Sequence, residues 1–131
     1  NHFAIKHTGR FISQDIFEAL VAEAIEGLPV EFLDRLDNVG IVAADWPTEE
    51  QRRYHNLSPR DTLLGLYEGV ALTDRESYGM VLPDKITIFQ RPLEGIAENE
   101  EDLFYQVQVT VVHEIAHHFG INDERLHELG Y

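Results

Sequence analysis

The stretch near the C-terminal end that decides how the chain is organised reads Val111-Val112-His113-Glu114-Ile115-Ala116-His117-His118-Phe119-Gly120-Ile121-Asn122-Asp123. Positions i and i+4 of an α-helix lie on one face, so His113 and His117 can direct their imidazole nitrogens at a single point. A zinc ion at that point would take N–metal bonds of roughly 2.0–2.1 Å. Glu114 lies beside this point, where a carboxylate can accept a proton from a water that the metal activates. The pattern therefore predicts a helix with a zinc site and with Glu114 as general base.

The helix that carries this pattern is predicted to begin at Asn99, a capping residue followed by the acidic run Glu100-Glu101-Asp102. Apolar residues at helical spacing then trace one face: Leu103, Phe104, Val107, Val111, Ile115 and Phe119. His113 and His117 lie off this stripe. The helix can therefore bury one face and present its metal ligands to a cleft.

A third zinc ligand must come from the chain after the helix, because two imidazoles hold a catalytic zinc ion poorly. Gly120 allows the left-handed turn that brings the chain back toward the metal, and Asp123 follows one short turn later as the predicted ligand. Two alternatives stay open. Asp123, like its neighbour Asn122, can instead cap a final helix over residues 124–129, and His127 lies four residues beyond Asp123 on the same side. His118 points about 100° away around the helix and is not expected to bind the metal.

The composition limits the classes of partner. The 131 residues are expected to form a single domain, with residues 1–12 as a loosely ordered extension. The formal net charge of −14 repels phosphate backbones and anionic membranes, so we expect no nucleic-acid or membrane partner, whereas a cationic or neutral substrate is compatible with it. The chain has no cysteine, which leaves histidine and carboxylate as the strong metal ligands. The sequence has neither the pattern of a signal peptide nor an apolar run of transmembrane length, and we expect a cytoplasmic location. The oligomeric state is left open.

The remaining sequence predicts further helices and strands. A helix begins at the N-cap Ser13 and ends at Gly27, and a shorter helix runs over residues 31–36. Strands are predicted over residues 39–44, which should be buried, 63–70, with a bulge or close backbone approach, and 85–91. Two segments are predicted to be irregular, namely residues 48–62, an exposed loop in which His55 is solvated, and the linker over residues 92–94.

Several segments besides residues 113–123 match one known family: Phe17-Glu18-Ala19-Leu20-Val21, Asp37-Asn38-Val39, Asp45-Trp46-Pro47, Leu63-Leu64-Gly65-Leu66-Tyr67-Glu68-Gly69, Leu82-Pro83-Asp84-Lys85-Ile86 and Leu129-Gly130-Tyr131. Over residues 14–131 the chain resembles the bacterial minimal zincin-like family of small metallopeptidases. The resemblance implies a two-layer α+β fold, with a small mixed β-sheet packed against the active-site helix and an N-terminal helix. It also implies zinc at His113 and His117 with Glu114 as general base. The extended motif resembles that of zincins whose third ligand is an aspartate, which here is Asp123.

These features together predict a zinc-dependent peptidase that acts on peptides or unfolded proteins. Glu114 would remove a proton from the attacking water and pass it to the leaving amine. The strand over residues 63–70 could bind the peptide through its edge, and Tyr67, Tyr78 or Tyr131 could donate a hydrogen bond to the oxyanion. The alternatives are a non-catalytic zinc-containing module that binds a peptide or partner, and a hydrolase of a non-peptide amide. The intact Glu114 argues against the non-catalytic module.

Overall fold

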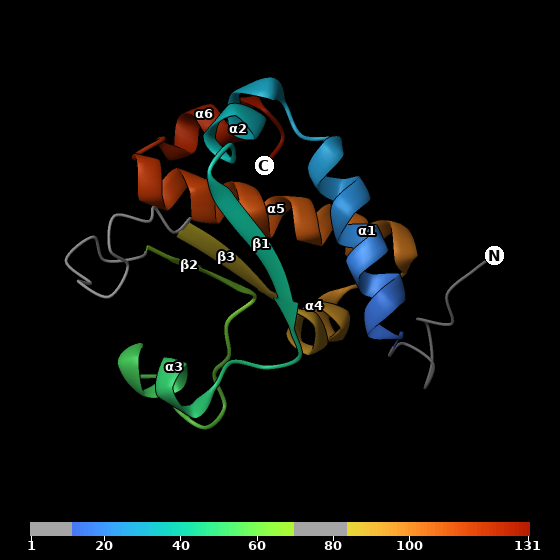
Figure 1. The fold of residues 1–131 in the computed structure, drawn as a ribbon, viewed down its shortest axis with the longest axis vertical. Helices are drawn as coiled ribbons and strands as arrows, with labels where there is room; N and C mark the ends of the chain where they lie inside the picture. Colours follow the sequence, from blue (N-terminus) through green and yellow to red (C-terminus); the bar gives the residue numbers. More distant parts are fainter. Residues whose placement is uncertain (1–11, 70–83) are drawn as a thin grey trace, which may run out of the picture.

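A computed structural model describes residues 12–69 and 84–131 of the chain. The helices and strands of these residues are shown in Figure 1. In chain order they are α1 (Gln14–Glu26), α2 (Val30–Arg35), β1 (Val39–Ala44), α3 (Glu49–Tyr54), β2 (Gly65–Glu68), β3 (Asp84–Phe89), α4 (Gln90–Ile96), α5 (Glu100–Phe119) and α6 (Asp123–Glu128). This mixture of helices with a small sheet confirms the predicted α+β class.

The sheet is mixed and has three strands in the order β1-β3-β2. β1 runs parallel to the central strand β3, whereas β2 is antiparallel to it, with Gly65 opposite Ile88 and Glu68 opposite Lys85. Central β3 is the buried strand, and the side chain of its Ile86 has no exposed surface. The sequence predicts a buried strand at β1, but this edge strand is mostly half-buried because only one of its sides has a neighbouring strand.

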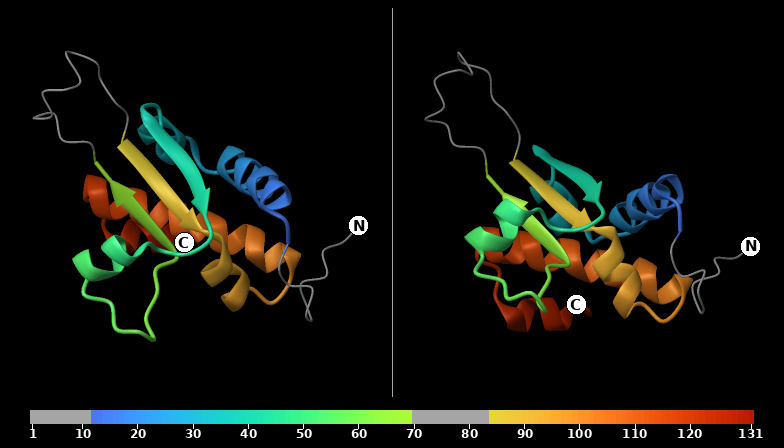
Figure 2. Two further views of the ribbon diagram at one scale, coloured as in Figure 1. Left: turned by 60° about the horizontal axis from the view of Figure 1, so that its bottom comes forward. Right: turned by 90° about the horizontal axis from the view of Figure 1, so that it is seen from below.

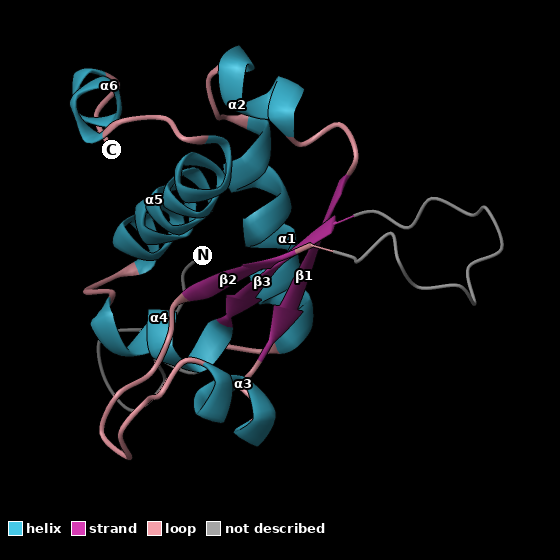
Figure 3. Cartoon of the chain, turned by 90° about the vertical axis from the view of Figure 1, so that its left-hand side faces the viewer, coloured by secondary structure: helices cyan, strands magenta, loops and turns pink. Residues whose placement is uncertain are grey.

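Helix α5 packs against one face of the sheet, and α3 lies on the other side (Figure 3). The buried residues of α5 are Leu103, Val107, Thr110, Val111, Val112, Ile115 and Ala116. They extend around more of the helix than the predicted stripe, because α5 contacts α1, α2 and α4 as well as β2 and β3. The prediction is wrong for Phe119, the last member of the stripe, which is 44% exposed. Phe119 is the last residue of α5, and its ring meets the Tyr67 ring edge-on with centroids 6.4 Å apart.

The predicted ends of the two long helices are confirmed by their capping contacts. Ser13 Oγ accepts a hydrogen bond from Ile16 N at 3.2 Å, and Asn99 Oδ1 accepts one from Asp102 N at 2.7 Å. Gly120 ends α5 with φ of 75°, the left-handed conformation that a residue with a side chain adopts only at a cost. Local side-chain chemistry therefore sets the length of α5, which carries the motif.

Two segments predicted to be irregular are helical. Thr48 Oγ1 accepts from Gln51 N at 3.0 Å and Gln51 Oε1 accepts from Thr48 N at 2.9 Å, a capping box that starts α3. The predicted linker over residues 92–94 lies inside α4. Pro92 is tolerated there because it occupies the first turn, where backbone N–H groups have no acceptor within the helix.

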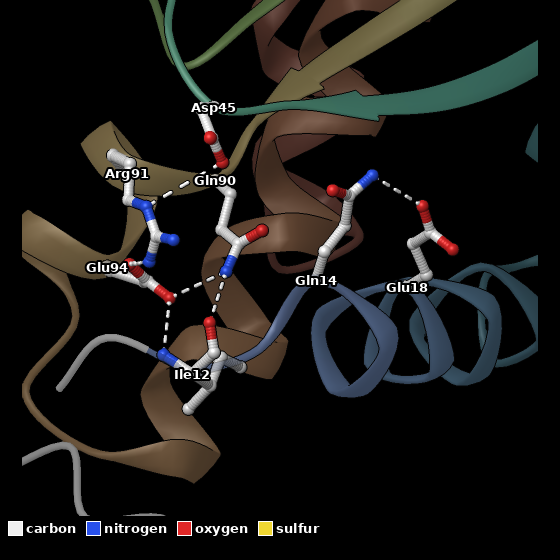
Figure 4. A network of polar contacts seen from close by, with 7 residues as sticks. All are labelled: Ile12, Gln14, Glu18, Asp45, Gln90, Arg91 and Glu94. Carbon is white, nitrogen blue, oxygen red and sulfur yellow. Dashed lines mark hydrogen bonds and ion pairs between the residues drawn. The ribbon is translucent and has the colours of Figure 1, made fainter. Parts of the chain in front are cut away.

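A buried polar network joins the start of α1 to α4 (Figure 4). The Glu94 side chain has no exposed surface and accepts hydrogen bonds from Ile12 N at 3.0 Å, Gln90 Nε2 at 2.9 Å and Arg91 Nη1 at 2.8 Å. Three donors, one of them charged, offset the cost of burying this carboxylate. The contacts hold Ile12 against α4.

The predicted loose extension over residues 1–12 lies outside the described residues except for Ile12, which is 8% exposed and belongs to the core. Across residues 12–69 and 84–131, every helix is too short or too polar to span a lipid bilayer.

The close approach of β2 to α5 can be tested at Gly65. A Cβ at Gly65 would lie 2.5 Å from Thr110 Cγ2, so Gly65→Ala should lower the free energy of unfolding by about 1–3 kcal/mol. Urea unfolding measures the change. The control is Gly95→Ala in α4, where a Cβ would meet no atom within 4 Å and the substitution should be neutral or stabilising. Adding Thr110→Ala to Gly65→Ala should restore stability, and an unchanged loss in the double variant would contradict the clash.

Candidate functional site

The two motif histidines lie on the same side of α5, as their spacing predicts. Their ring centroids are 6.3 Å apart and the ring planes meet at 73°. His117 is exposed, whereas His113 is half-buried and its Nε2 lies 3.1 Å from the backbone carbonyl oxygen of Tyr131. A carbonyl oxygen only accepts, so this contact requires a proton on Nε2. A metal bound through that nitrogen would have to displace Tyr131.

Glu114 reaches across from α5 to the edge of β2. Its Oε1 accepts a hydrogen bond from the backbone N–H of Tyr67 at 2.9 Å. Burial raises the pKa of Glu114 above its usual value, and the Tyr67 hydrogen bond and the charges of His117, His113 and His55 oppose that rise. A carboxyl group with a raised pKa beside two imidazoles is the arrangement expected of a general base.

Asn122, not Asp123, caps the last helix. Asn122 Oδ1 accepts a hydrogen bond from Arg125 N at 2.8 Å, and Asp123 is the first helical residue of α6. The alternative in which Asp123 acts as the cap is therefore wrong. Asp123 and His127 are both exposed, so the choice between them as third ligand stays open.

The segment after α5 is anchored to α2 as well as to α5. Arg125 Nη2 of α6 lies 2.6 Å from Glu31 Oε1 of α2, and both helices lie near the C-terminal end of α5 (Figure 1). The Tyr131 ring packs edge-on against Phe32, with centroids 6.2 Å apart. Burial, and then the charge of Tyr105, raises the pKa of Tyr131. This packing fixes the Tyr131 carbonyl oxygen beside His113.

Histidine and carboxylate side chains are suitable zinc ligands, but the described residues do not bring three of them together around one point. Residues 12–69 and 84–131 contain no group of three or more His, Asp or Glu side chains placed to hold a metal ion. Two imidazoles on one tetrahedral zinc ion have ring centroids about 5 Å apart. The histidine pair, at 6.3 Å, is therefore slightly more open than a ligated pair. By residue type alone, His113, His117 and a carboxylate such as Asp123 form a donor set that is chemically suitable for zinc.

The side chain of Tyr67 is engaged by His118 and Asp84, which argues against Tyr67 as the donor to the oxyanion. Its ring stacks on His118 with centroids 3.9 Å apart, and its hydroxyl donates to Asp84 Oδ2 at 2.8 Å. Burial, followed by the hydrogen bond and the charge of Asp84, raises the pKa of Tyr67 to about 12. Tyr78, another candidate donor, lies outside the described residues. What Tyr67 supplies to the site is its backbone N–H, and no sequence motif signals such a contact.

A pocket of about 580 Å³ lies between α3 and β2, which are neighbours in both views of Figure 2. Its lining residues are Thr48, Glu50, Gln51, Tyr54, His55, Leu66, Tyr67, Glu68, Gly69 and Lys85. The prediction placed His55 in a solvated loop; it is exposed, but it ends α3, lines this pocket and acts electrostatically on Glu114. The sequence signal that indicates α3 is the capping-box pair Thr48 and Gln51, which the loop prediction overlooked.

Comparison with known proteins supplies a family and a fold. Residues 36–131 match the family model described as zincin-like metallopeptidase. The structure of a conserved hypothetical protein from Thermo thermophilus is similar, with a TM-score of 0.53 and 19% sequence identity over 82% of this chain and 94% of that chain. At this identity the similarity establishes a common fold. No curated protein matches the sequence.

The raised pKa of Glu114 predicts how stability depends on pH in the metal-free protein. Because the folded state binds the proton more tightly than the unfolded state, this stabilising contribution is present below the unfolded pKa and is lost as pH rises through the folded pKa. Glu114→Gln keeps the acceptor for Tyr67 N–H and removes the buried charge. Urea unfolding between pH 4 and 8 should show the variant gaining stability over wild type as pH rises. Glu101→Gln, at an exposed position of α5, should show no such gain, and a difference that shrinks with rising pH would contradict the burial effect.

Proposed function

The chain belongs to the zincin-like metallopeptidase family, and we propose that it is a zinc-dependent peptidase that hydrolyses peptide bonds. One observation carries this proposal. Glu114, the residue next to His113, has a raised pKa and is fixed by Tyr67 N–H at 2.9 Å. A non-catalytic site would need no such carboxyl group, whereas proton transfer does.

His113, His117 and Asp123 are the proposed zinc ligands. Bound zinc would supply Lewis-acid chemistry, lowering the pKa of a water toward about 7 and polarising a carbonyl group. The chain supports this set with two imidazoles on one side of α5 and a carboxylate freed from capping by Asn122. His127 is the alternative third ligand.

Glu114 moves the proton in the proposed reaction. It accepts a proton from the attacking water and passes it to the leaving amine, so that its own charge is restored at the end. Burial of the carboxyl group raises its proton affinity, which favours the first transfer. The hydrogen bond from Tyr67 N–H to Oε1 restricts the position of the Glu114 carboxylate and so also sets the direction of its second oxygen.

The proposed substrates are peptides or unfolded proteins, which can lie extended along β2. That edge has one constraint, because Glu114 already occupies its N–H donor at Tyr67. A bound peptide must therefore use other backbone groups of the edge or displace Glu114. The net charge of −14 supports the absence of nucleic-acid and anionic-membrane partners, and the cytoplasmic location stays a prediction.

The second candidate is a non-catalytic, zinc-containing module that binds a peptide or partner. The observation that favours it is the contact between Tyr131 O and His113 Nε2 at 3.1 Å, which opposes metal binding at that nitrogen. Under the peptidase proposal, zinc bound through His113 Nε2 would have to displace this contact.

Hydrolysis by Glu114→Gln separates the two candidates. The variant keeps the shape of the side chain but cannot accept the proton, so kcat/KM should fall by about 10²–10⁴-fold. The measurement uses a quenched-fluorescence peptide library with zinc-loaded wild type and variant, and zinc content is determined for both. If wild type cleaves no peptide faster than Glu114→Gln does, the chain is not a peptidase.

Zinc affinity tests the ligand assignment. His117→Ala and Asp123→Ala should each weaken zinc binding by at least about tenfold in competition titrations, because even groups that only support a ligand contribute 10–100-fold. His118→Ala is the matched control beside His117 and should retain affinity. His127→Ala should also retain it, and loss of binding in His127→Ala with none in Asp123→Ala would move the third ligand to His127.

A further inference from the structure

The pocket between α3 and β2 adjoins the proposed active site at Tyr67. Tyr67 lines the pocket, and its backbone N–H also holds Glu114. Side chains alternate along a strand, and Gly65 faces α5, since a Cβ there would contact Thr110. Leu66 and Glu68 therefore face α3 and the pocket. A peptide lying along the edge of β2 would direct every second side chain to this side.

The size of the pocket suits a long side chain. Its volume of about 580 Å³ falls in the usual range of about 300–1,000 Å³ for small-ligand sites. Leu66, which is 7% exposed, supplies an apolar wall. Tyr54 stands at the rim, 83% exposed, with its ring edge-on to His55 at 5.1 Å between centroids. An aliphatic stem can pack on Leu66 while a charged head stays near the rim.

The charges of the lining favour a cation. Among the lining residues Lys85 is the one lysine or arginine, and Glu68 lies 3.9 Å from it. The other basic side chain of the lining is His55. Within the described parts of the chain, Glu50 forms no ion pair with any residue. The exposed Tyr54 ring offers a face for a cation. The net charge of −14 adds a long-range attraction for cationic substrates.

We propose that the α3–β2 pocket receives a lysine or arginine side chain of the substrate, close to the bond that is cut, with Glu50 as its charged partner. The part of this inference that concerns cleavage beside a basic residue rests on the proposed peptidase function. The binding selectivity itself does not depend on hydrolysis. The pocket therefore assigns a substrate class, peptides with a basic residue beside the scissile bond.

The test uses blocked pentapeptides with a single central lysine, arginine, norleucine or glutamate and alanine elsewhere. Norleucine matches the stem of lysine without its charge. Binding to metal-free protein is followed by ¹⁵N NMR, and cleavage by zinc-loaded protein is measured separately. Lysine and arginine peptides should bind more tightly than norleucine and glutamate peptides, with shift changes on α3 and β2. Glu50→Gln should reduce the lysine preference about twofold to fivefold.

Glu49→Gln is the matched control. Glu49 and Glu50 are neighbours in the first turn of α3 and both are exposed, but Glu49 pairs with Arg53 at 3.7 Å and does not line the pocket. The proposal requires the lysine preference to fall in Glu50→Gln and to persist in Glu49→Gln. Selective binding without cleavage of any peptide would support the pocket and overturn the peptidase function. Cleavage with no preference for lysine or arginine, or equal effects of both variants, would overturn the pocket and leave the peptidase function standing.

Discussion

The contact between α5 and the edge of β2 determines the rest of the site. Gly65 has no side chain, so the methyl group of Thr110 can occupy the space where a Cβ would stand. The helix therefore comes close enough for Glu114 to accept the Tyr67 N–H at 2.9 Å. A helix held further from the sheet would leave Glu114 in solvent, and its pKa would not be raised by burial. Gly65 in β2 is therefore needed for Glu114 on α5 to reach the Tyr67 N–H.

The hydrogen bond from Tyr67 N–H to Glu114 offsets two unfavourable features of the structure. Burial of a carboxyl group disfavours its charged form, and an edge strand exposes backbone donors without partners. When Glu114 accepts from Tyr67 N–H, the carboxylate gains a donor and the edge loses an unpaired group. Under the proposed function, a peptide that pairs with β2 at Tyr67 would compete with Glu114 for this N–H. The same backbone group would then bear on substrate binding and on the position of the proton acceptor.

The sequence predicted those features that depend on local side chains and periodicity. The caps Ser13 and Asn99 and the shared face of His113 and His117 follow from spacing and residue type, and the structure agrees. The sequence did not predict contacts whose partner is distant in the chain or has no characteristic residue type. Glu114 binds a backbone group 47 positions away, and a backbone N–H belongs to nearly every residue. It also left open which of two adjacent residues caps α6, because asparagine and aspartate cap equally well and the geometry alone selects Asn122.

The alternation of side chains along β2 allows one short strand to serve two surfaces. Gly65 and Tyr67 face α5, where the first permits close approach and the second stacks on His118. Leu66 and Glu68 face α3 and form a wall of the pocket. A register shift of one residue would exchange these surfaces, placing Leu66 against Thr110 and removing the space that Gly65 provides. The antiparallel pairing with buried β3 prevents this shift, so the core of the sheet fixes the site and the pocket together.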